Sequence, residues 1–296
     1  MEAKNTSMRS VEKYYISALY RAILKREPDE KGLADHIARA EKIGFPIYYE
    51  IMLNDFLSCK EASGQLYARL VPKLIAPLME IAKGIPIISL GSHCANSYIW
   101  KIIGLKHESG PFDWIFSNPA MVADCLQDNF SLFLDRSQFM TVPVAERISP
   151  TTNLCDHLYF KSKYGIKCIF NHRDPCASDE DYRYVIRCVE RFRNQLTNNS
   201  LKLFVLLTEE TARSLDDFKL VANRLSALAR KYKFIFVTTN INPSVGEPTG
   251  QLLYESPVAC FAKMTSLGPL GPVNFDEVID MSFFINTVLK YAVSDL

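Results

Sequence analysis

The sequence has no long apolar run and no surplus of charge of either sign. No stretch approaches the roughly 18 consecutive apolar residues that a membrane-spanning helix needs. Lys and Arg number 34 and Asp and Glu number 33, which leaves a net charge of +1. This balance gives no electrostatic basis for nucleic-acid binding. Residues 1–10 are polar and contain no apolar signal-peptide core, so we expect a cytoplasmic protein without a membrane span.

Internal repeats, low-complexity tracts and several well-known chemical motifs are also missing. The chain lacks the Cys-x2-Cys pairs of structural zinc sites and the Gly-x-Ser-x-Gly turn of serine esterases. The segment Gly268-Pro269-Leu270-Gly271 is not a phosphate-binding loop, because no lysine follows it. The remaining composition, 48% hydrophobic and 23% charged in 296 residues, is typical of a globular protein with two domains.

Residues 1–83 predict a small all-helical, adaptor-like domain. Apolar side chains recur at three- and four-residue spacing from Val11 to Ile23, which is the pattern of a helix with one buried face. Charges and a proline in segment 25–29 end that helix. Three further helices are predicted, over residues 32–42, 47–58 and 61–79.

Residues 84–296 predict an α/β domain with a mainly parallel sheet flanked by helices. Short apolar runs alternate with amphipathic segments, and this alternation is typical of parallel sheets with helices on both faces. The predicted strands cover residues 85–90, 166–170, 201–207 and 234–237. The predicted helices cover residues 94–103, 119–129, 182–196, 215–231 and 275–291. The segment 243–271, rich in glycine and proline, is predicted to be a surface loop.

Polar and reactive residues follow each predicted strand. In open parallel sheets, ligands collect outside the carboxyl ends of the strands. Those ends carry the segments Gly91-Ser92-His93-Cys94, Asn171-His172-Arg173-Asp174, Thr208-Glu209-Glu210 and Thr238-Thr239-Asn240. The pattern therefore places the chemistry of the protein in these four segments.

Eight cysteines are present, and in a reducing compartment they stay thiols. Cys94 is the best candidate for a nucleophile. It is predicted in the first turn of a helix, where unpaired N–H groups lower the pKa of a thiol and can hold an oxyanion. His172 is the candidate base, with His93 as a competing one. The group that would orient the imidazole is open among Asp113, Asn171, Asp174 and Asn240.

Three other interpretations compete with a catalytic Cys94. A small thiol at this place also packs a helix onto a strand. A second interpretation is the nucleophile turn of a serine esterase, with Ser92 attacking, although the rest of that motif is absent. The third is zinc, but the spacing of the candidate ligands is not that of structural zinc sites, so we predict no metal. Those candidate ligands are Cys155, His157, Cys168, His172 and Cys176.

Residues 12–62 resemble a bacterial helical domain of unknown function that is similar to phycobilisome-linker repeats. The matching segments keep the pattern Arg-x-Pro-Asp-x-x-Gly. They are Ala18-Leu19-Tyr20-Arg21, Arg26-Glu27-Pro28-Asp29-Glu30-Lys31-Gly32-Leu33 and Phe56-Leu57-Ser58. Such domains are commonly joined to enzymes that build or modify bacterial surface glycans. The resemblance implies docking to glycan-assembly enzymes through this domain.

Residues 85–240 resemble a bacterial family of papain-like cysteine peptidases. The resemblance is carried by Ser89-Leu90-Gly91-Ser92-His93-Cys94, by Gly110-Pro111-Phe112-Asp113-Trp114, and by Asn171-His172 with Arg191-Phe192. It implies Cys94 as nucleophile, His172 as base and Asp113 as a further site residue. His93 stands where the family usually has asparagine, which leaves the oxyanion donor open. We assign oxyanion or substrate-positioning roles to Ser92, His93, Asn171 and Asp174.

Two reactions stay open at such a site. The chain is also similar to capsule enzymes with a Gly-Asn-Cys motif, which are thought to transfer acyl groups from coenzyme A to sugar hydroxyls. Peptide hydrolysis and acyl transfer both need a thiolate, a base and an oxyanion site. We expect either a peptidase-like cysteine hydrolase without a cofactor or an acyltransferase with acyl-CoA as donor. The substrate would be an acyl, peptide or glycan compound of surface-polysaccharide metabolism. The alternative is a non-catalytic glycan- or protein-binding module with a degenerate site.

Overall fold

The computed structural model describes residues 13–14, 16–21, 26–43, 76–147, 152–271 and 273–294. The chain divides into two compact units, residues 1–74 and 75–296. The predicted helix over 47–58 and most of the one over 61–79 lie outside the described residues. Helix α5 (Ala76–Ala82) belongs to the second unit. The adaptor role of the first unit stays a prediction.

In the first unit, helix α2 (Glu30–Ile43) explains the pattern Arg-x-Pro-Asp-x-x-Gly. Asp29 precedes the helix, and its carboxylate accepts a hydrogen bond from the Gly32 amide at 2.8 Å, as an N-cap residue does. This hydrogen bond holds the pKa of Asp29 below its usual value. The guanidinium of Arg26 lies over the ring of Tyr20, 5.0 Å from its centre. The motif is therefore a helix start.

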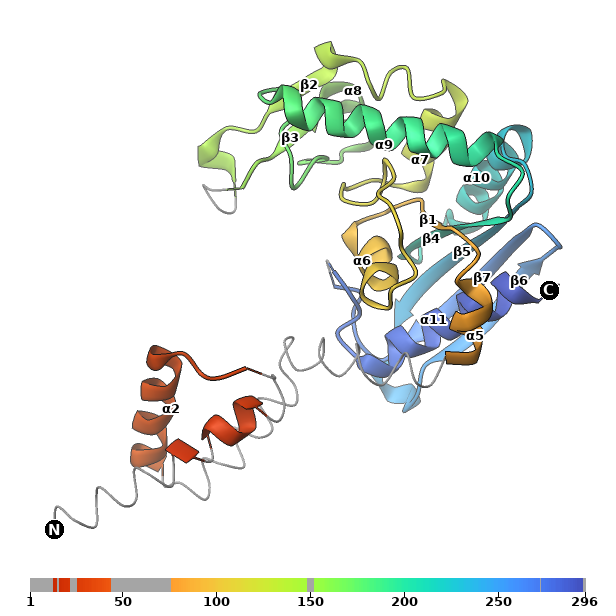
Figure 1. The fold of residues 1–296 in the computed structure, drawn as a ribbon. Helices are drawn as coiled ribbons and strands as arrows, with labels where there is room; N and C mark the ends of the chain where they lie inside the picture. Colours follow the sequence, from red (N-terminus) through yellow and green to blue (C-terminus); the bar gives the residue numbers. More distant parts are fainter. Residues whose placement is uncertain are drawn as a thin grey trace, which may run out of the picture. The chain divides into compact units, whose positions relative to one another are not determined.

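Five strands form the sheet of the second unit, in the order β1-β4-β5-β7-β6 (Figure 1). Strands β1, β4, β5 and β7 pair in parallel, and β6 pairs antiparallel to β7 at one edge. The predicted α/β class with a mainly parallel sheet is confirmed. The bounds are β1 (Ile87–Ser89), β4 (Lys202–Glu209), β5 (Tyr232–Ile241), β6 (Thr249–Glu255) and β7 (Ala259–Ser266).

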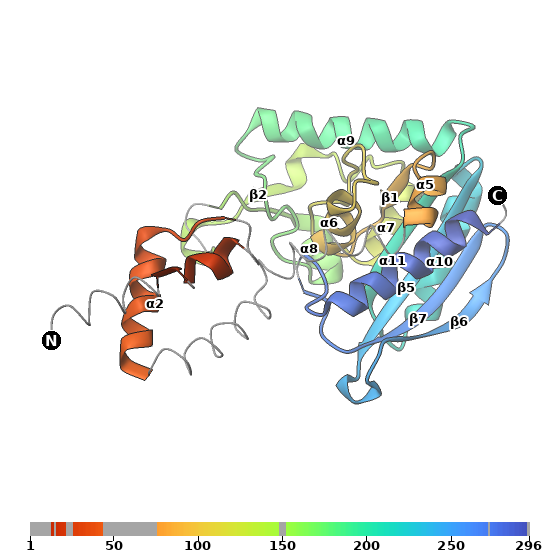
Figure 2. The same ribbon diagram turned by 60° about the horizontal axis from the view of Figure 1, so that its bottom comes forward.

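Helices cover both faces of this sheet. Alternate residues of β5 point to opposite faces and show which helices cover each one. On one face, Phe234 stacks with Phe218 of α10 (Ser214–Leu228), and Phe236 packs edge-on against the same ring. The ammonium of Lys233 donates to the Tyr291 carbonyl of α11 (Val278–Val293) at 2.9 Å on the other. Helix α6 (Cys94–Ile102) shares the face of α11, since Trp100 packs against Phe284 of α11 (Figure 2).

The chain between β1 and β4 contributes a second layer of structure beside the sheet. It contains the antiparallel pair β2 (Phe139–Thr141) and β3 (Cys155–His157), with helices α7 (Pro119–Gln127), α8 (Leu158–Tyr164) and α9 (Asp179–Thr197). Its core is aromatic. The rings of Phe112, Phe130 and Phe192 are fully buried, with centres 5.3 to 6.0 Å apart; Phe192 packs edge-on against the other two, which are tilted to each other. Figure 2 shows α9 running along the top of this layer.

The segment 166–170, predicted as a strand of the sheet, is not one. Cys168 has a positive φ of 52°, and its amide donates to the carboxylate of Asp156 at 2.5 Å. Both features bend the chain away from an extended strand. Phe170 forms isolated β-bridges. Asn171-His172 therefore comes from a loop of the second layer and not from the parallel sheet.

The prediction of a surface loop over 243–271 is also wrong, because this segment contains β6 and β7. Strand β7 pairs with β5 from Ala259 to Ser266 and is mostly buried. Proline and glycine do lie here, but mostly outside the strands, as in the short turn Pro243–Val245 and the following Gly246; Gly250 lies within β6. The turn residues around β6 and β7 therefore made the segment resemble a loop, and neither strand was predicted.

Candidate active site

The turn that presents Cys94 connects β1 to α6. Gly91 has a φ of 92°, and a Cβ there would lie 2.1 Å from Oγ of Ser117, so this position requires glycine. The Ser117 amide donates to the carbonyl of Ser92 at 2.7 Å. The side-chain amide of Asn96 donates to the Gly91 carbonyl at 3.0 Å. These contacts fix the turn and with it the position of the thiol.

Cys94 is the first residue of α6 and is only 3% exposed. The preceding His93 is in extended conformation, and its side chain makes no capping hydrogen bond to the first turn. The first amides of a helix have no partner inside the helix. The amide of Cys94 itself acts as a donor toward the sulfur, and this contact favours the thiolate.

The loop after Phe170 brings two side chains to this sulfur. Sγ of Cys94 lies 3.4 Å from Nε2 of His172. Nδ2 of Asn171 donates toward the same sulfur at 3.5 Å, and Oδ1 of Asn171 lies 4.0 Å from it. Cys94 is buried, Asn171 is half-buried and His172 is exposed. The geometry thus places a buried thiol, a half-buried amide and an exposed imidazole together.

Burial dominates the ionisation of the pair. It raises the pKa of Cys94 above its usual value of 9.0; the hydrogen bonds from Asn171 and the Cys94 amide lower it, and the charge of Asp113 raises it further. Burial and the neighbouring charge of Arg173 lower the pKa of His172 below 6.5. At neutral pH the resting pair is therefore a thiol and a neutral imidazole. The backbone amide at the start of α6 lowers the pKa of Cys94 as expected, but desolvation of the thiolate outweighs this effect, so the net shift is upward.

Asp113 is fully buried and supports the helix that carries Cys94. One carboxylate oxygen accepts a hydrogen bond from Oγ of Ser97 on α6 at 2.5 Å. The other accepts the Gly110 amide and forms an ion pair with Nζ of Lys106, both at 2.6 Å. The hydrogen bonds and the ion pair of Asp113 described above therefore join α6 to the Gly110–Trp114 loop. None of these contacts joins Asp113 to the imidazole of His172.

The other predicted site residues have different surroundings. Oγ of Ser92 donates to the Leu207 carbonyl at 3.1 Å. The carboxylate of Asp174 accepts the amides of Cys176 and Ala177, each at 3.1 Å, and so closes a turn. Nδ1 of His93 and Oδ1 of Asn240 are buried without a hydrogen-bond partner. Burial lowers the pKa of His93, and the charge of Glu209 opposes this shift.

Sequence reasoning missed two residues that support the site. Ser97 lies three positions after Cys94 on the same helix, a spacing that places both on one face, and this spacing was the available signal. Lys106 gave no signal, because nothing in the sequence relates it to Asp113. Its side chain is 6% exposed and that of Asp113 is 0% exposed, so the charges are paired out of contact with water.

Among the described residues, no group of three or more His, Cys, Asp or Glu side chains is arranged to hold a metal ion. The zinc interpretation of Cys155, His157, Cys168 and Cys176 therefore has no cluster behind it in the described part of the chain. None of the described helices is long and apolar enough to cross a membrane.

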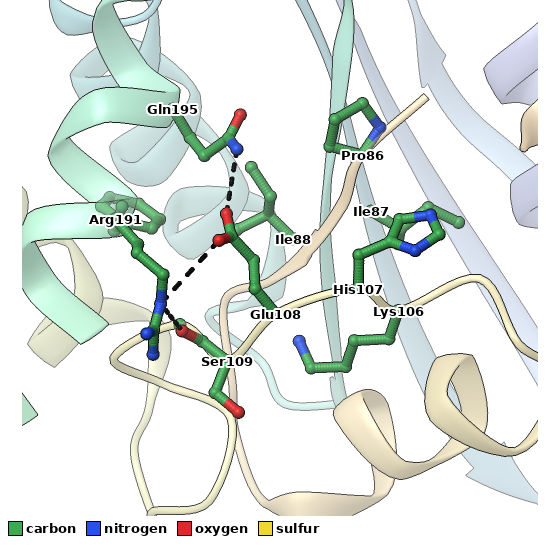
Figure 3. A pocket seen from close by; sticks show the side chains of 11 residues that line it. Pro86, Ile87, Ile88, Lys106, His107, Glu108, Ser109, Arg191 and Gln195 are labelled. Atoms are coloured by element: carbon green, nitrogen blue, oxygen red, sulfur yellow. Dashed lines mark hydrogen bonds and ion pairs between the residues drawn. The ribbon is translucent and has the colours of Figure 1, made fainter. Parts of the chain in front are cut away.

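A cavity of about 100 Å³ lies at the other end of β1 from Cys94. Its floor includes Pro86 and Ile87 at the start of the strand. Figure 3 shows the carboxylate of Glu108 between Arg191 and Gln195, with distances of 3.9 Å and 3.0 Å. This cavity is thus separate from the thiol–imidazole pair, since neither Cys94 nor His172 lines it.

The family model described as "Putative papain-like cysteine peptidase (DUF1796)" matches residues 86–242, which is more than half of the chain. A curated relative is the uncharacterized protein R408 of Acanthamoeba polyphaga mimivirus, which is 29% identical over 133 residues. This match covers 40% of the chain and 59% of the viral protein, so the chain spans less than two thirds of that relative. No solved structure matches the chain.

Proposed function

The chain belongs to this DUF1796 family, and on that premise we propose that it is an acyl-group enzyme with Cys94 as nucleophile and His172 as general base. The observation that carries the proposal is the distance of 3.4 Å between Sγ of Cys94 and Nε2 of His172. A base within hydrogen-bond reach of the proton it removes is the first requirement of this chemistry. Because the resting pair is neutral, the proton moves to the imidazole as the sulfur attacks.

The first half-reaction forms a thioester. Sγ of Cys94 bonds to the acyl carbon of the substrate while its proton passes to Nε2 of His172. The acyl oxygen takes the negative charge, and Nδ2 of Asn171 and the Cys94 amide are the donors nearest to the sulfur. The intermediate then collapses, and the imidazolium gives its proton to the leaving group.

The second half-reaction returns the thiol. The neutral imidazole takes a proton from the attacking water or hydroxyl group, which bonds to the acyl carbon and releases Cys94. Water gives hydrolysis and an acceptor hydroxyl gives acyl transfer. His172 serves both, because the exposed imidazole is reachable from solvent while the thiol beneath it is buried.

The rival proposal, a non-catalytic binding module with a degenerate site, expects the sulfur of Cys94 to lie beyond hydrogen-bond reach of any imidazole. The contact with His172 favours the enzyme. We further propose that the first unit docks to glycan-assembly enzymes. Support for this comes from its resemblance to helical domains of such enzymes and from the helix start at Asp29, which keeps their pattern.

Covalent capture tests the proposed function. The full chain is incubated with acyl-CoA donors and with peptide esters, and its intact mass is measured. We expect a mass increase of one acyl group, mapped to Cys94 and absent from Cys94→Ala. Cys260→Ala is the matched control, since Cys260 is equally buried at 3% exposure but lies within strand β7. No adduct with any donor, or an adduct that persists in Cys94→Ala, contradicts the proposal.

A further inference from the structure

A second, smaller pocket lies beside the loop that carries His172. It has a volume of about 20 Å³. The side chains around it are mostly aromatic or apolar, and Ile115, Phe170 and Cys188 are buried. Its lining includes Trp114, Ile115, Phe170, Arg173, Tyr184 and Cys188.

This pocket borders the loop that brings Asn171 and His172 to the thiol, although none of these three side chains lines it. Phe170 and Arg173 line it, and they immediately flank Asn171-His172, whose side chains both contact Sγ of Cys94. Electrostatics agree with this placement. The charge of Arg173 lowers the pKa of His172, and the charge of Asp113 raises the pKa of both Cys94 and Cys188.

One wall of the pocket is rigidly held. The guanidinium of Arg173 lies 3.6 Å from the ring centre of Tyr184, a cation–π contact. Its Nη1 also donates to the carboxylate of Asp181 at 2.7 Å, which fixes the guanidinium over the ring. Asp181 and Tyr184 both belong to α9, so the helix sets the width of the pocket.

We propose that this pocket receives the acyl side of the substrate and selects the acetyl group over longer acyl chains. The proposal rests on the proposed function. A cavity of roughly 10–15 Å³ holds one water molecule, which is about the size of a methyl group. The pocket, at about 20 Å³, therefore takes one methyl group in its apolar interior. A longer chain has to displace Tyr184 from beneath Arg173.

The rate of acylation of Cys94 tests this selection. The full chain is treated separately with p-nitrophenyl acetate, butyrate and octanoate, and the adduct at Cys94 is quantified by peptide mapping. Each rate is divided by the rate of the same ester with N-acetylcysteine, which removes differences in intrinsic reactivity. We expect acetate to exceed butyrate by about 10-fold or more, the discrimination that apolar pockets achieve for small changes in length. Octanoate is expected to be slower still.

Variants of two tyrosines of α9 show whether a change in acyl-chain selection comes from the pocket or from a general disturbance of the helix. Tyr184→Ala opens the wall and is expected to lower the acetate-to-butyrate ratio at least about 5-fold. Tyr182→Ala is the matched control: Tyr182 is also half-buried and lies under Arg136, at 4.9 Å, but does not line the pocket. The control is expected to keep the ratio of the unmodified chain.

The outcomes distinguish the pocket from the function. Equal normalised rates for the three esters at Cys94, or an unchanged ratio in a folded Tyr184→Ala, would refute acyl selection by the pocket. Either result would leave the assignment of Cys94 as nucleophile unaffected. If Tyr184→Ala does not fold, the chain-length series of the unmodified protein still decides. If no ester acylates Cys94, the proposed function fails and the pocket assignment fails with it.

Discussion

Sγ of Cys94 and Nε2 of His172 lie 3.4 Å apart, although the two residues are 78 positions apart in the sequence. Their positions come from two layers of the second unit. Cys94 begins α6 on the sheet, and His172 belongs to the loop that follows the bridge at Phe170. The candidate pair therefore depends on how the second layer packs on the sheet, and the following variants probe that dependence.

Removing the imidazole tests its role as base. We expect His172→Gln to slow acylation of Cys94 by about 10²–10⁴-fold, the usual contribution of a general base. The rate is measured by intact mass with p-nitrophenyl acetate at pH 7. His107→Gln is the control, since His107 is exposed and lines the cavity at the start of β1. Equal rates in the two variants would show that His172 removes no proton.

The pH dependence of alkylation reports the state of the thiol. The raised pKa of Cys94 means that the thiolate becomes the major form only above pH 9.0. We therefore expect its reaction with iodoacetamide, followed by peptide mapping, to increase with pH through 9 and beyond. A thiolate–imidazolium pair would instead give a plateau of high reactivity near neutral pH, and finding that plateau would refute the neutral resting pair.

The acid side of the activity profile reports the state of His172. Burial, followed by the charge of Arg173, lowers the pKa of His172 below 6.5. An imidazole accepts a proton only when neutral, so acylation is retained as pH falls to 6.5 and is lost below it. Arg173→Gln removes the cation, and we expect it to move this loss to higher pH. Arg173→Lys keeps the charge and serves as the control; an equal shift in both variants would exclude the electrostatic cause.

The side-chain amide of Asn171 is predicted to stabilise the oxyanion. Its Nδ2 lies 3.5 Å from the sulfur that the substrate carbonyl must approach. We expect Asn171→Ala to lower the acylation rate about 10²–10³-fold, the usual loss for one oxyanion donor. Alkylation of Cys94 by iodoacetamide, which develops no oxyanion, serves as the comparison. A loss of equal size in both reactions would indicate a displaced thiol and no oxyanion role.

The buried pair of Lys106 and Asp113 makes a prediction about stability. Lys106→Met leaves a carboxylate with 0% exposure without its cation, and we expect the free energy of unfolding to fall by about 3–5 kcal/mol. Denaturant unfolding measures the change. The double variant Lys106→Met with Asp113→Asn is expected to recover part of it, because no unpaired charge remains. Lys83→Met removes the exposed pair with Glu80 and should cost far less.

The sequence was informative where hydrophobic patterns are long and locally consistent. The helix predicted over residues 182–196 is confirmed as part of α9, which starts three residues earlier, where Ser178 caps a first turn of acidic residues. Strands β4 and β5 each contain a continuous apolar run, and both predicted strands are confirmed. Strand β7 was not predicted, because it contains Lys263 and lies between turn residues. Such a segment resembles a loop when the strands that pair with it are unknown.

The sequence predicted that Cys94 and His172 both follow strands of the parallel sheet, and this prediction is correct for Cys94 alone. Cys94 does follow a strand of the sheet, but the run before His172 is bent at Cys168. Dihedral angles of this kind depend on tertiary contacts such as the one between Asp156 and the Cys168 amide. The partner of Asp113 could not be predicted for a similar reason, since ion pairs between loops leave no periodic pattern.

The difference in exposure between Cys94 and His172 sets an order of events for the proposed reaction. Cys94 is 3% exposed, while the imidazole beside it faces solvent. The first product leaves, and the water or hydroxyl acceptor arrives, past the same imidazole. The acyl group must therefore wait on the sulfur until the first product has departed. Kinetically, this is a double-displacement sequence in which one product is released before the second reactant is used.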